Sequence, residues 1–247
     1  MDTVKSLLKR NAKVEHWLRQ LRLHLIKYYR RFANVLSYRE TPKSNASLSR
    51  IERGPHIDIP PNTEARDFIN TTNCRTIAEI GVYTGGTSEL FAQHLNGEGE
   101  LHLFDYEDHV NEVKAKLNAA GYSNVYAHGN SRRPLDSYSW SLMRVLQEHP
   151  NPIYDYVFLD GAHTWTIDAL AFLLIDRLLK VGGFVQFDDY YWTIELGLEN
   201  DRPEVKEWYT KEQRRVPHVR LIVDLLVKRD PRYTEVVPNK IYKKIRS

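Results

Sequence analysis

Acidic residues stand at the ends of two β-rich segments, where they could bind a metal ion. Asp160 ends the segment IYDYVFLD, and Asp188 and Asp189 follow the segment GGFVQF. Because neighbouring strands of a sheet lie only about 4.8 Å apart, the three carboxylates would meet at one edge. Carboxylates that close repel one another unless a cation lies between them, and oxygen ligands suit Mg²⁺, Mn²⁺ or Ca²⁺. The alternative is that Asp188 and Asp189 are solvated turn residues, or that one of them caps a helix.

A small ligand could bind at the glycine-containing turn of the segment TIAEIGVYTGGTSELFA. Gly81 and Gly85 let the backbone turn sharply and approach a ligand, and the helix that begins near Ser88 directs its first N–H groups to the same place. The turn lacks the Lys of a phosphate loop and the GxGxxG spacing of a dinucleotide site. Glu79, before the first glycine, favours a ligand with an amine or another cationic group. A plain strand-to-helix turn is the alternative interpretation.

Further polar residues follow the next two β-rich segments. Asp105 ends LHLFD, 24 residues after Gly81, and an acid at about this distance is well placed to accept hydrogen bonds from ribose hydroxyls. Asp108 is the competing acid, although it could instead cap the next helix. Asn130 and Ser131, in the segment YAHGNS, could contact the edge of a base.

These residues need a scaffold that places them together, and the pattern of the chain predicts one. From about residue 60 onward, short β-rich runs alternate with helix-length segments, which is typical of a doubly wound α/β domain. Ligands of such folds bind at the carboxyl ends of the strands, where the strand order reverses. We predict a seven-stranded Rossmann-like sheet with helices on both faces. The expected strands cover residues 76–81, 100–104, 124–128, 154–160, 183–188, 233–237 and 240–245. The expected helices cover residues 88–95, 109–120, 139–148, 167–179 and 219–228.

The N-terminal part of the chain has a different character. Residues 1–40 contain ten Lys or Arg and three Asp or Glu, a net charge of +7, whereas residues 41–247 contain 25 and 29, a net charge of −4. Apolar residues recur there at steps of three and four, which predicts an amphipathic helix with basic outer faces: Val14, Trp17, Leu21, Leu25, Tyr28, Phe32 and Val35. We therefore divide the chain into a basic helical arm with a linker, residues 1–50, and a main domain, residues 51–247.

The apolar stripe of the arm could pack on the main domain or on a second copy of the chain. We expect a homo-oligomer joined through the arm, with peripheral contact to anionic lipid as the alternative. No segment has the roughly 20 apolar residues of a membrane span, and the N-terminus lacks the pattern of a signal peptide. Cys74 is the single cysteine, so no intramolecular disulfide framework exists. We expect a cytoplasmic protein, at the inner membrane surface if the arm binds lipid. The net charge of +3 is too small to indicate nucleic-acid binding.

Four motifs resemble those of the class I S-adenosylmethionine-dependent methyltransferases. They are EIGVYTGGTS, the acid of FDYED, VFLDGAHTW and LLKVGGFVQFDDYYW, in this order and at these spacings. Within this class, the DGAH motif and the pair of aspartates are similar to the metal-dependent O-methyltransferases that act on sugars and natural-product hydroxyls, the macrocin O-methyltransferase type. The resemblance covers residues 60–245 and leaves out the arm. It implies that the main domain is an S-adenosylmethionine-dependent methyltransferase domain.

The resemblance also implies a role for each candidate residue. The cofactor-binding residues would be Glu79, Gly81, Gly85, Ser88, Asp105, Asn130, Ser131 and Asp160. Of these, the turn residues would hold the methionine end of S-adenosylmethionine, Asp105 the ribose, and Asn130 and Ser131 the adenine. A divalent ion, with Mg²⁺ as the first choice, would bind to Asp160, Asp188 and Asp189. The catalytic residues would be His163 and Asp160, either of which could be the general base.

The implied reaction is transfer of a methyl group to a hydroxyl of a sugar, a glycan or a natural-product small molecule. The positive sulfur of the cofactor makes its methyl group electrophilic, and coordination to a metal ion lowers the pKa of the acceptor hydroxyl. Tyr190, Tyr191 and Trp192 could stack against the acceptor, and the polar residues 201–220 would form a lid over it. Trp165 stands where relatives commonly have Tyr, which leaves the acceptor open.

Two alternative functions remain. The first is a methyltransferase that acts on nitrogen or on RNA. A base-directed enzyme of this kind would be expected to carry an Asn/Asp-Pro-Pro-aromatic motif after the fourth strand, where this chain has DGAH. The second is a cofactor-binding scaffold that has lost its activity. The presence of all three aspartates argues against it.

Overall fold

The computed structural model describes residues 59–133 and 135–247, which contain the predicted sheet. Its seven strands have the order β3-β2-β1-β4-β5-β7-β6. The strands are β1 Thr76–Ile80, β2 Glu100–Tyr106, β3 Val125–Asn130, β4 Tyr154–Leu159, β5 Leu179–Phe187, β6 Tyr233–Val237 and β7 Ile241–Lys244. Strands β1 to β5 are parallel, and β7 runs antiparallel to both of its neighbours. The doubly wound fold is confirmed. The predicted arm helix and the domain boundary after residue 50 lie outside the described residues.

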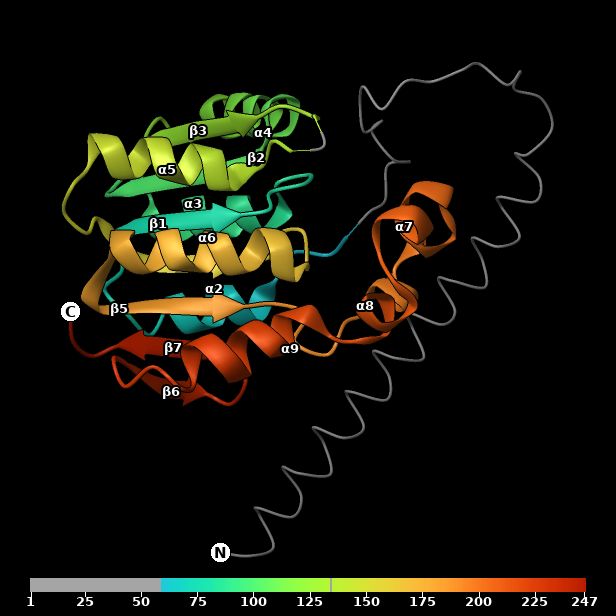
Figure 1. Ribbon diagram of the computed structural model, residues 1–247. Coiled ribbons are helices and arrows are strands. Elements are labelled where there is room, and N and C mark those ends of the chain that lie inside the picture. The colour runs from blue at the N-terminus through green and yellow to red at the C-terminus, as the bar shows by residue number, and fades with distance from the viewer. Residues whose placement is uncertain (1–58, 134) are drawn as a thin grey trace, which may run out of the picture.

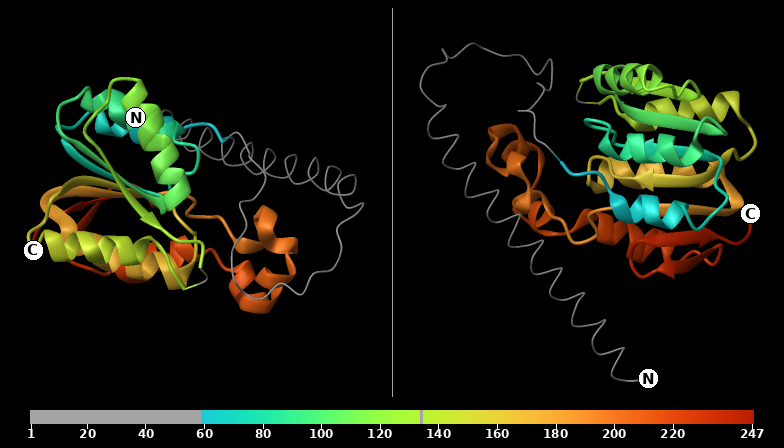
Figure 2. Two further views of the ribbon diagram at one scale, coloured as in Figure 1. Left: turned by 90° about the horizontal axis from the view of Figure 1, so that it is seen from above. Right: turned by 180° about the vertical axis from the view of Figure 1, so that it is seen from behind.

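Helices cover both faces of the sheet (Figures 1 and 2). One face carries α2 Thr63–Ile69, α3 Gly86–Leu95 and α4 Glu107–Ala119. The other carries α5 Tyr138–Glu148, α6 Trp165–Leu178 and α9 His218–Ile222, which continues into a π-helical turn, Val223–Val227. Between β5 and α9 lie two short 3₁₀ helices, Ile194–Leu196 and Leu198–Asp201, followed by α7 Pro203–Trp208 and α8 Lys211–Arg215. Helices α7 and α8 stand beyond the carboxyl ends of the parallel strands (Figure 1), where the sequence predicts a lid.

Two apolar cores lie on the two faces of the sheet. Phe172, Leu178 and Phe187 belong to the core under α5, α6 and α9, whereas Phe91 and Phe158 belong to the core under α2, α3 and α4. The parallel strands are buried on both faces, so they consist of nearly continuous apolar runs rather than an alternating pattern. This is why the strands could be located in the sequence.

The start of β5 and the presence of α2 differ from the prediction. Strand β5 begins at Leu179, directly after α6, whereas the sequence predicts its start at Gly183. The pairing of β4 with β5 shifts register between Tyr154 and Tyr156, and Gly182 has a φ of +91°. The glycines therefore form an irregularity within the strand instead of a turn before it. Helix α2 was not predicted, because its seven residues are too few to show a helical period.

Within the described residues, no helix is long and apolar enough to cross a membrane.

Two histidines form a hydrogen-bonded pair between β2 and β3. His102 Nδ1 lies 2.9 Å from His128 Nε2, and their rings stack on each other. Tyr126 also stacks on His102, and Phe104 stacks on His128. Burial lowers the pKa of each imidazole to about 4. Both rings are therefore neutral at neutral pH.

We expect the free energy of unfolding to fall as the pH drops from about 6.5 to about 4. An unfolded histidine takes up its proton near pH 6.5, whereas each folded imidazole resists protonation until about pH 4, so acid favours the unfolded chain. The loss is about 3 kcal/mol for one imidazole. The variant His128→Phe keeps an aromatic ring on Phe104 and should remove part of the fall. Urea denaturation at about pH 7 and about pH 4.5 measures the difference, and an equal fall in the variant contradicts the assignment.

Candidate active site

The carboxyl ends of β1, β4 and β5 meet where the strand order reverses. β1 lies between β2 and β4, so the strands that follow it, β2 and β3, extend toward one edge of the sheet, whereas β4 and β5 extend toward the other. The Asp160 N–H donates to the Ile80 carbonyl at 2.9 Å, and the Asp188 N–H donates to the Leu159 carbonyl at 3.1 Å. These bonds continue the parallel pairing past the ends of the strands. The residues that follow the three strands are thereby held side by side.

The glycine turn after β1 is in close contact with protein atoms. Gly81 has a φ of +89°, and a Cβ at this position would lie 1.9 Å from the carbonyl oxygen of Asp160. Gly85 has a φ of +80°, and a Cβ there would lie 2.6 Å from the Val113 side chain of α4. Glycine is required at both positions because Asp160, directly after β4, and Val113 of α4 leave no room for a side chain. The sequence did not reveal this reason.

Glu79 is a buried carboxyl at the end of β1. It is 1% exposed, and the Ser88 hydroxyl of α3 donates a hydrogen bond to it. Burial raises the pKa of Glu79 well above its usual value, and the charges of Asp160 and Asp105 raise it further. A cationic group next to Glu79 would favour its ionised form. The structure thus brings two predicted cofactor residues, Glu79 and Ser88, into contact.

Asp105 lies at the end of β2 and is bonded to the glycine turn. Its Oδ2 accepts hydrogen bonds from the N–H groups of Val82 and Tyr83, each at 2.8 Å. Its Oδ1 accepts the Tyr106 N–H at 2.6 Å and lies 3.3 Å from His109 Nδ1. Burial alone would raise the pKa of Asp105, but these hydrogen bonds outweigh it and lower the pKa. Asp105 therefore holds the glycine turn in its ionised form. A ribose hydroxyl that bonds to Asp105 would compete with its contacts to Val82, Tyr83, Tyr106 and His109. The sequence did not single out His109.

A pocket of about 430 Å³ lies beside the end of β3. It is lined by Glu107, Asp108, Asn111, Asn130, Ser131, Arg132 and Arg133. Asn130 is 7% exposed, and its Oδ1 has no hydrogen-bond partner among the described residues. Asp108, the competing ribose acid, pairs with Arg132 at 3.1 Å, and the Arg132 guanidinium lies 4.0 Å from the centre of the Tyr106 ring. The sequence analysis did not single out Arg132 or Tyr106. For Tyr106 the signal was its position directly after Asp105, and for Arg132 the sequence carried no comparable signal.

Two of the predicted metal ligands and His163, one of the two candidates for the general base, form a cluster. Asp160, His163 and Asp189 each offer a ligand atom, and these atoms all lie within 4.8 Å of one another. His163 Nε2 is 2.9 Å from Asp160 Oδ1 and 3.7 Å from Asp189 Oδ2. Asp188 precedes Asp189 directly but does not belong to this group. The sequence analysis expected Asp160, Asp188 and Asp189 as metal ligands and His163 as a candidate base, whereas the group that the structure brings together contains Asp160, His163 and Asp189.

The cluster holds its imidazole in the charged form. Burial alone would lower the pKa of His163, but the hydrogen bond that its ring donates to Asp160 and the charges of Asp189 and Asp160 raise it to about 10. At neutral pH, His163 is therefore protonated in this arrangement and cannot take a proton from another group. Tyr83, His163 and Asp189 also have φ values of +49°, +54° and +53°. Left-handed backbone at non-glycine residues is uncommon and gathers at functional sites.

A tryptophan packs on the cluster. The Trp192 ring lies 5.1 Å from the His163 ring, and a Cβ at Gly197 would lie 2.6 Å from Trp192. Trp165, at the start of α6, is 37% exposed. The Tyr190 hydroxyl donates to Asp224 at 2.8 Å and so belongs to a different contact. Trp192 is thus a predicted acceptor-stacking residue that packs on the cluster.

Residues 78–190 match the sequence model of a family described as "Methyltransferase domain". The match runs from β1 past β5 and contains every predicted site residue from Glu79 to Asp189. Together with the Rossmann-like sheet, the match makes this region of the chain similar to a methyltransferase domain.

Two O-methyltransferases are among the solved structures that share this fold. One is the O-methyltransferase TomG from Streptomyces achromogenes in complex with SAM, which is 20% identical, with 72% of this chain and 77% of that chain covered and a TM-score of 0.51. The other is an O-methyltransferase from Bacillus cereus in complex with SAH, which is 19% identical, with 77% and 84% covered and a TM-score of 0.55. At these identities the likeness shows the fold alone.

A curated relative matches a shorter region. An uncharacterised protein of Acanthamoeba polyphaga mimivirus is 29% identical over 122 residues, which are 47% of this chain and 51% of the relative. The chain therefore spans about half the length of the curated relative that it matches.

Proposed function

We propose that this protein is an S-adenosylmethionine-dependent O-methyltransferase whose reaction is assisted by a divalent metal ion. The observation that carries the proposal is the cluster of Asp160, His163 and Asp189 directly beside the glycine turn of β1. A methyl donor in the turn and an acceptor at the cluster would adjoin each other. The O-methyltransferases with a similar fold support this choice of chemistry.

The residues around the turn fit S-adenosylmethionine. When bound, this cofactor supplies an electrophilic methyl group on a positively charged sulfur. The buried carboxyl of Glu79 suits the cofactor's amino group, since its ionised form needs a neighbouring cation. The buried Asn130 Oδ1 needs a hydrogen-bond donor, which an adenine amino group could provide. We propose that Asp105 orients the turn and accepts a ribose hydroxyl, and that Gly81, Gly85, Ser88 and Ser131 complete the site.

The cluster also fits a divalent ion. Two carboxylates and one imidazole can ligate Mn²⁺ or Mg²⁺, with the imidazole favouring the softer of the two. When bound, the ion would lower the pKa of an acceptor hydroxyl. The positive charge that His163 now supplies between the two carboxylates would come from the ion instead. Asp188, the third predicted ligand, stays a prediction.

Asp160 is the better candidate for the general base of the two that the sequence left open. The Nε2 of His163 lies 2.9 Å from Asp160 Oδ1, and if this nitrogen ligates the ion it has no lone pair left to accept a proton. Asp160 has a second carboxylate oxygen that can accept the proton of the acceptor hydroxyl. His163 would then hold Asp160 and Asp189 in place rather than move the proton itself.

The proposed acceptor is a hydroxyl of a sugar, a glycan or a natural-product small molecule. Trp192 offers a flat apolar surface beside the cluster, and such surfaces can stack on sugar or aromatic rings. Trp165 offers a partly exposed ring at the start of α6. Helices α7 and α8 would cover the acceptor. These features give no support to a nucleic acid, for which the net charge of +3 is also too small.

A methyl-transfer screen tests the proposal. Labelled S-adenosylmethionine is supplied with Mg²⁺ or Mn²⁺ and with sugars, catechols or polyketide glycosides as acceptors. We expect transfer to a hydroxyl that a chelator abolishes and added ion restores. Transfer that resists the chelator would overturn the metal assignment, and transfer only to amines or RNA bases would favour the nitrogen or RNA alternative. Cofactor binding without transfer to any acceptor would favour the inactive scaffold.

Deletion of residues 1–40 is expected to leave cofactor affinity within about twofold, because the cofactor residues all lie after residue 78. We propose that the arm joins copies of the chain or contacts anionic lipid, so the deletion should change the oligomeric state or the binding to vesicles. Size-exclusion chromatography and sedimentation with anionic liposomes measure the two effects. If neither property changes, both proposed roles of the arm are wrong.

A further inference from the structure

Helix α6 carries two buried aspartates, one near each end, and each is bonded to a tyrosine hydroxyl. Asp168, in the first turn, is 2% exposed and accepts a hydrogen bond from Tyr138 of α5. Asp176, in the last turn, is 4% exposed and accepts a hydrogen bond from Tyr233 of β6 at 2.8 Å. The first turn of α6 follows the turn that holds Asp160 and His163, whereas the last turn leads into β5 at the opposite edge. The same pair of side chains thus occurs at both ends of one helix, and only one pair lies next to the cluster.

The turn between β4 and α6 is bonded to the Tyr138–Asp168 pair on both sides of His163. The Ala162 N–H donates to Tyr138 Oη at 3.0 Å, and the Thr164 N–H donates to Asp168 Oδ2 at 3.0 Å. The Tyr138 hydroxyl therefore accepts a hydrogen bond from the Ala162 N–H and donates one to Asp168. Asp168 also accepts a hydrogen bond from the Thr164 N–H. This chain of bonds fixes the backbone immediately before and after the imidazole.

The Tyr138 hydroxyl also lies directly against the backbone of the turn. A Cβ at Gly161 would lie 2.3 Å from Tyr138 Oη. His163, two residues later, has a φ of +54°, a conformation that a non-glycine residue keeps only when its surroundings hold it there. The bonds to the neighbouring N–H groups provide such a restraint.

We propose that Tyr138 and Asp168 are positioning residues that hold residues 160–164 so that Asp160 and His163 face Asp189. This inference rests on the proposed function, since it assigns these two residues to the same site. A carboxylate that only caps α6 would explain the bond from Thr164. Such a capping role would not explain why the Ala162 N–H donates a hydrogen bond to the Tyr138 hydroxyl, since Ala162 lies two residues before the N-cap, Thr164.

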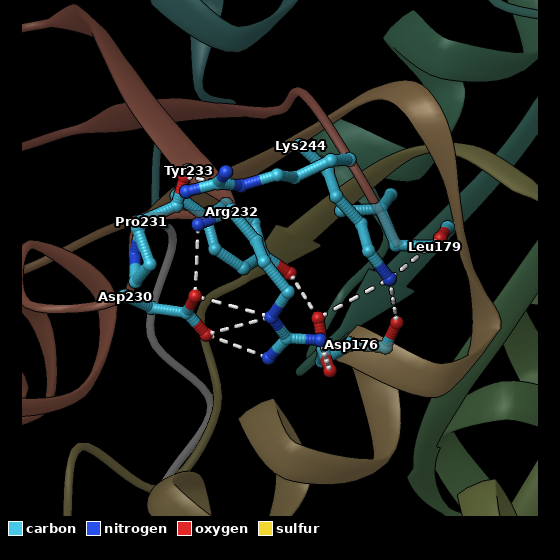
Figure 3. A network of polar contacts seen from close by, with 8 residues as sticks. Asp176, Leu179, Asp230, Pro231, Arg232, Tyr233 and Lys244 are labelled. Atoms are coloured by element: carbon cyan, nitrogen blue, oxygen red, sulfur yellow. Dashed lines mark hydrogen bonds and ion pairs between the residues drawn. The ribbon is translucent and has the colours of Figure 1, made fainter.

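The Tyr233–Asp176 pair provides a matched control, because it belongs to a network at the far end of α6 (Figure 3). Asp176 Oδ2 accepts from Arg232 at 2.8 Å, and Asp176 Oδ1 lies 3.2 Å from Lys244 Nζ. Asp230 also pairs with Arg232, at 2.6 Å. These contacts tie β6 and β7 to α6 and do not involve the turn after β4.

The experiment compares Tyr138→Phe with Tyr233→Phe in the full chain. Each variant removes one hydroxyl from a buried tyrosine–aspartate pair of α6. We expect Tyr138→Phe to speed hydrogen exchange of the Ala162 and Thr164 amides at least about tenfold and to lower kcat about tenfold, with the dissociation constant of S-adenosylmethionine changed by less than about twofold. Tyr233→Phe should leave the exchange of these two amides and kcat unchanged.

Equal losses of kcat in the two variants would overturn the inference, because both tyrosines would then act only through stability. Unchanged exchange of the two amides in Tyr138→Phe would overturn it as well. Should Tyr138→Phe not fold, Asp168→Ala and Asp168→Asn replace it, since only Asn can still accept from Thr164 and bond to Tyr138. The exchange measurement needs no catalysis. A parent chain without methyl transfer would therefore defeat the proposed function, while the exchange data would still decide the positioning role.

Discussion

Asp189→Asn is expected to lower metal-dependent methyl transfer by at least about 1,000-fold, or about 4 kcal/mol of transition-state stabilisation. The change removes one of the two negative charges of the cluster and weakens its hold on a divalent cation. Asparagine has nearly the same shape and adopts left-handed backbone readily, so the φ of +53° at this position is retained. The fold should survive, and circular dichroism and thermal unfolding check this.

Variants of two further aspartates make this test of the ion site more specific. Asp201 is 86% exposed and lies 3.9 Å from Lys206, so Asp201→Asn should change neither kcat/KM nor its dependence on Mg²⁺ and Mn²⁺. Asp188→Asn tests the ligand that the sequence predicts and the cluster does not contain. If Asp188→Asn loses as much metal-dependent methyl transfer as Asp189→Asn, Asp188 is also a ligand of the proposed ion. Full activity with unchanged metal dependence in Asp189→Asn would refute the proposed ion site.

Gly81→Ala is expected to weaken S-adenosylmethionine binding at least about 100-fold and to lower the free energy of unfolding by about 3 kcal/mol or more. The new Cβ would lie 1.9 Å from the Asp160 carbonyl oxygen, and this oxygen belongs to the backbone and cannot rotate away. Either the glycine turn or the turn after β4 must therefore move. Both carry proposed site residues, so binding and stability should fall together. Calorimetric titration and urea denaturation measure the two losses.

Gly97→Ala is the matched control for this variant. Gly97 has a φ of +81°, close to the +89° of Gly81, but a Cβ at Gly97 would meet no atom within 4 Å. An alanine there pays only for left-handed backbone, about 1 kcal/mol, and leaves cofactor binding unchanged. The difference between the two variants isolates the contact of Gly81 with Asp160. Equal effects would mean that backbone conformation alone accounts for the loss at Gly81.

Most of the fold could be predicted from the sequence. Strand β4 shows why: Tyr156, Val157, Phe158 and Leu159 are consecutive apolar residues, as expected for a strand that helices cover on both faces. The predictions were weaker where local patterns carry less information. α2 is too short to show a period, and the glycines near the start of β5 resemble a turn although they lie within the strand.

The sequence by itself determined the edge at which the site lies. Asp105, Asp160 and Asp189 each end or follow a strand, and parallel strands bring their carboxyl ends to one side whatever the packing around them. The residue types also restricted the chemistry, since carboxylates next to a glycine turn suit a cationic cofactor and a metal ion.

Only the tertiary structure decided which side chains meet within that edge. His163 joins Asp160 and Asp189 because the turn after β4 places it in left-handed backbone, and that turn is held by Tyr138 and Asp168 from two different helices. Contacts between residues far apart in the chain depend on how helices pack on the sheet, and no local period or spacing encodes this packing. Gly81 is a second example. The sequence predicts that Gly81 approaches a ligand, but its closest neighbour in the structure is the backbone of Asp160, a contact that no local pattern encodes.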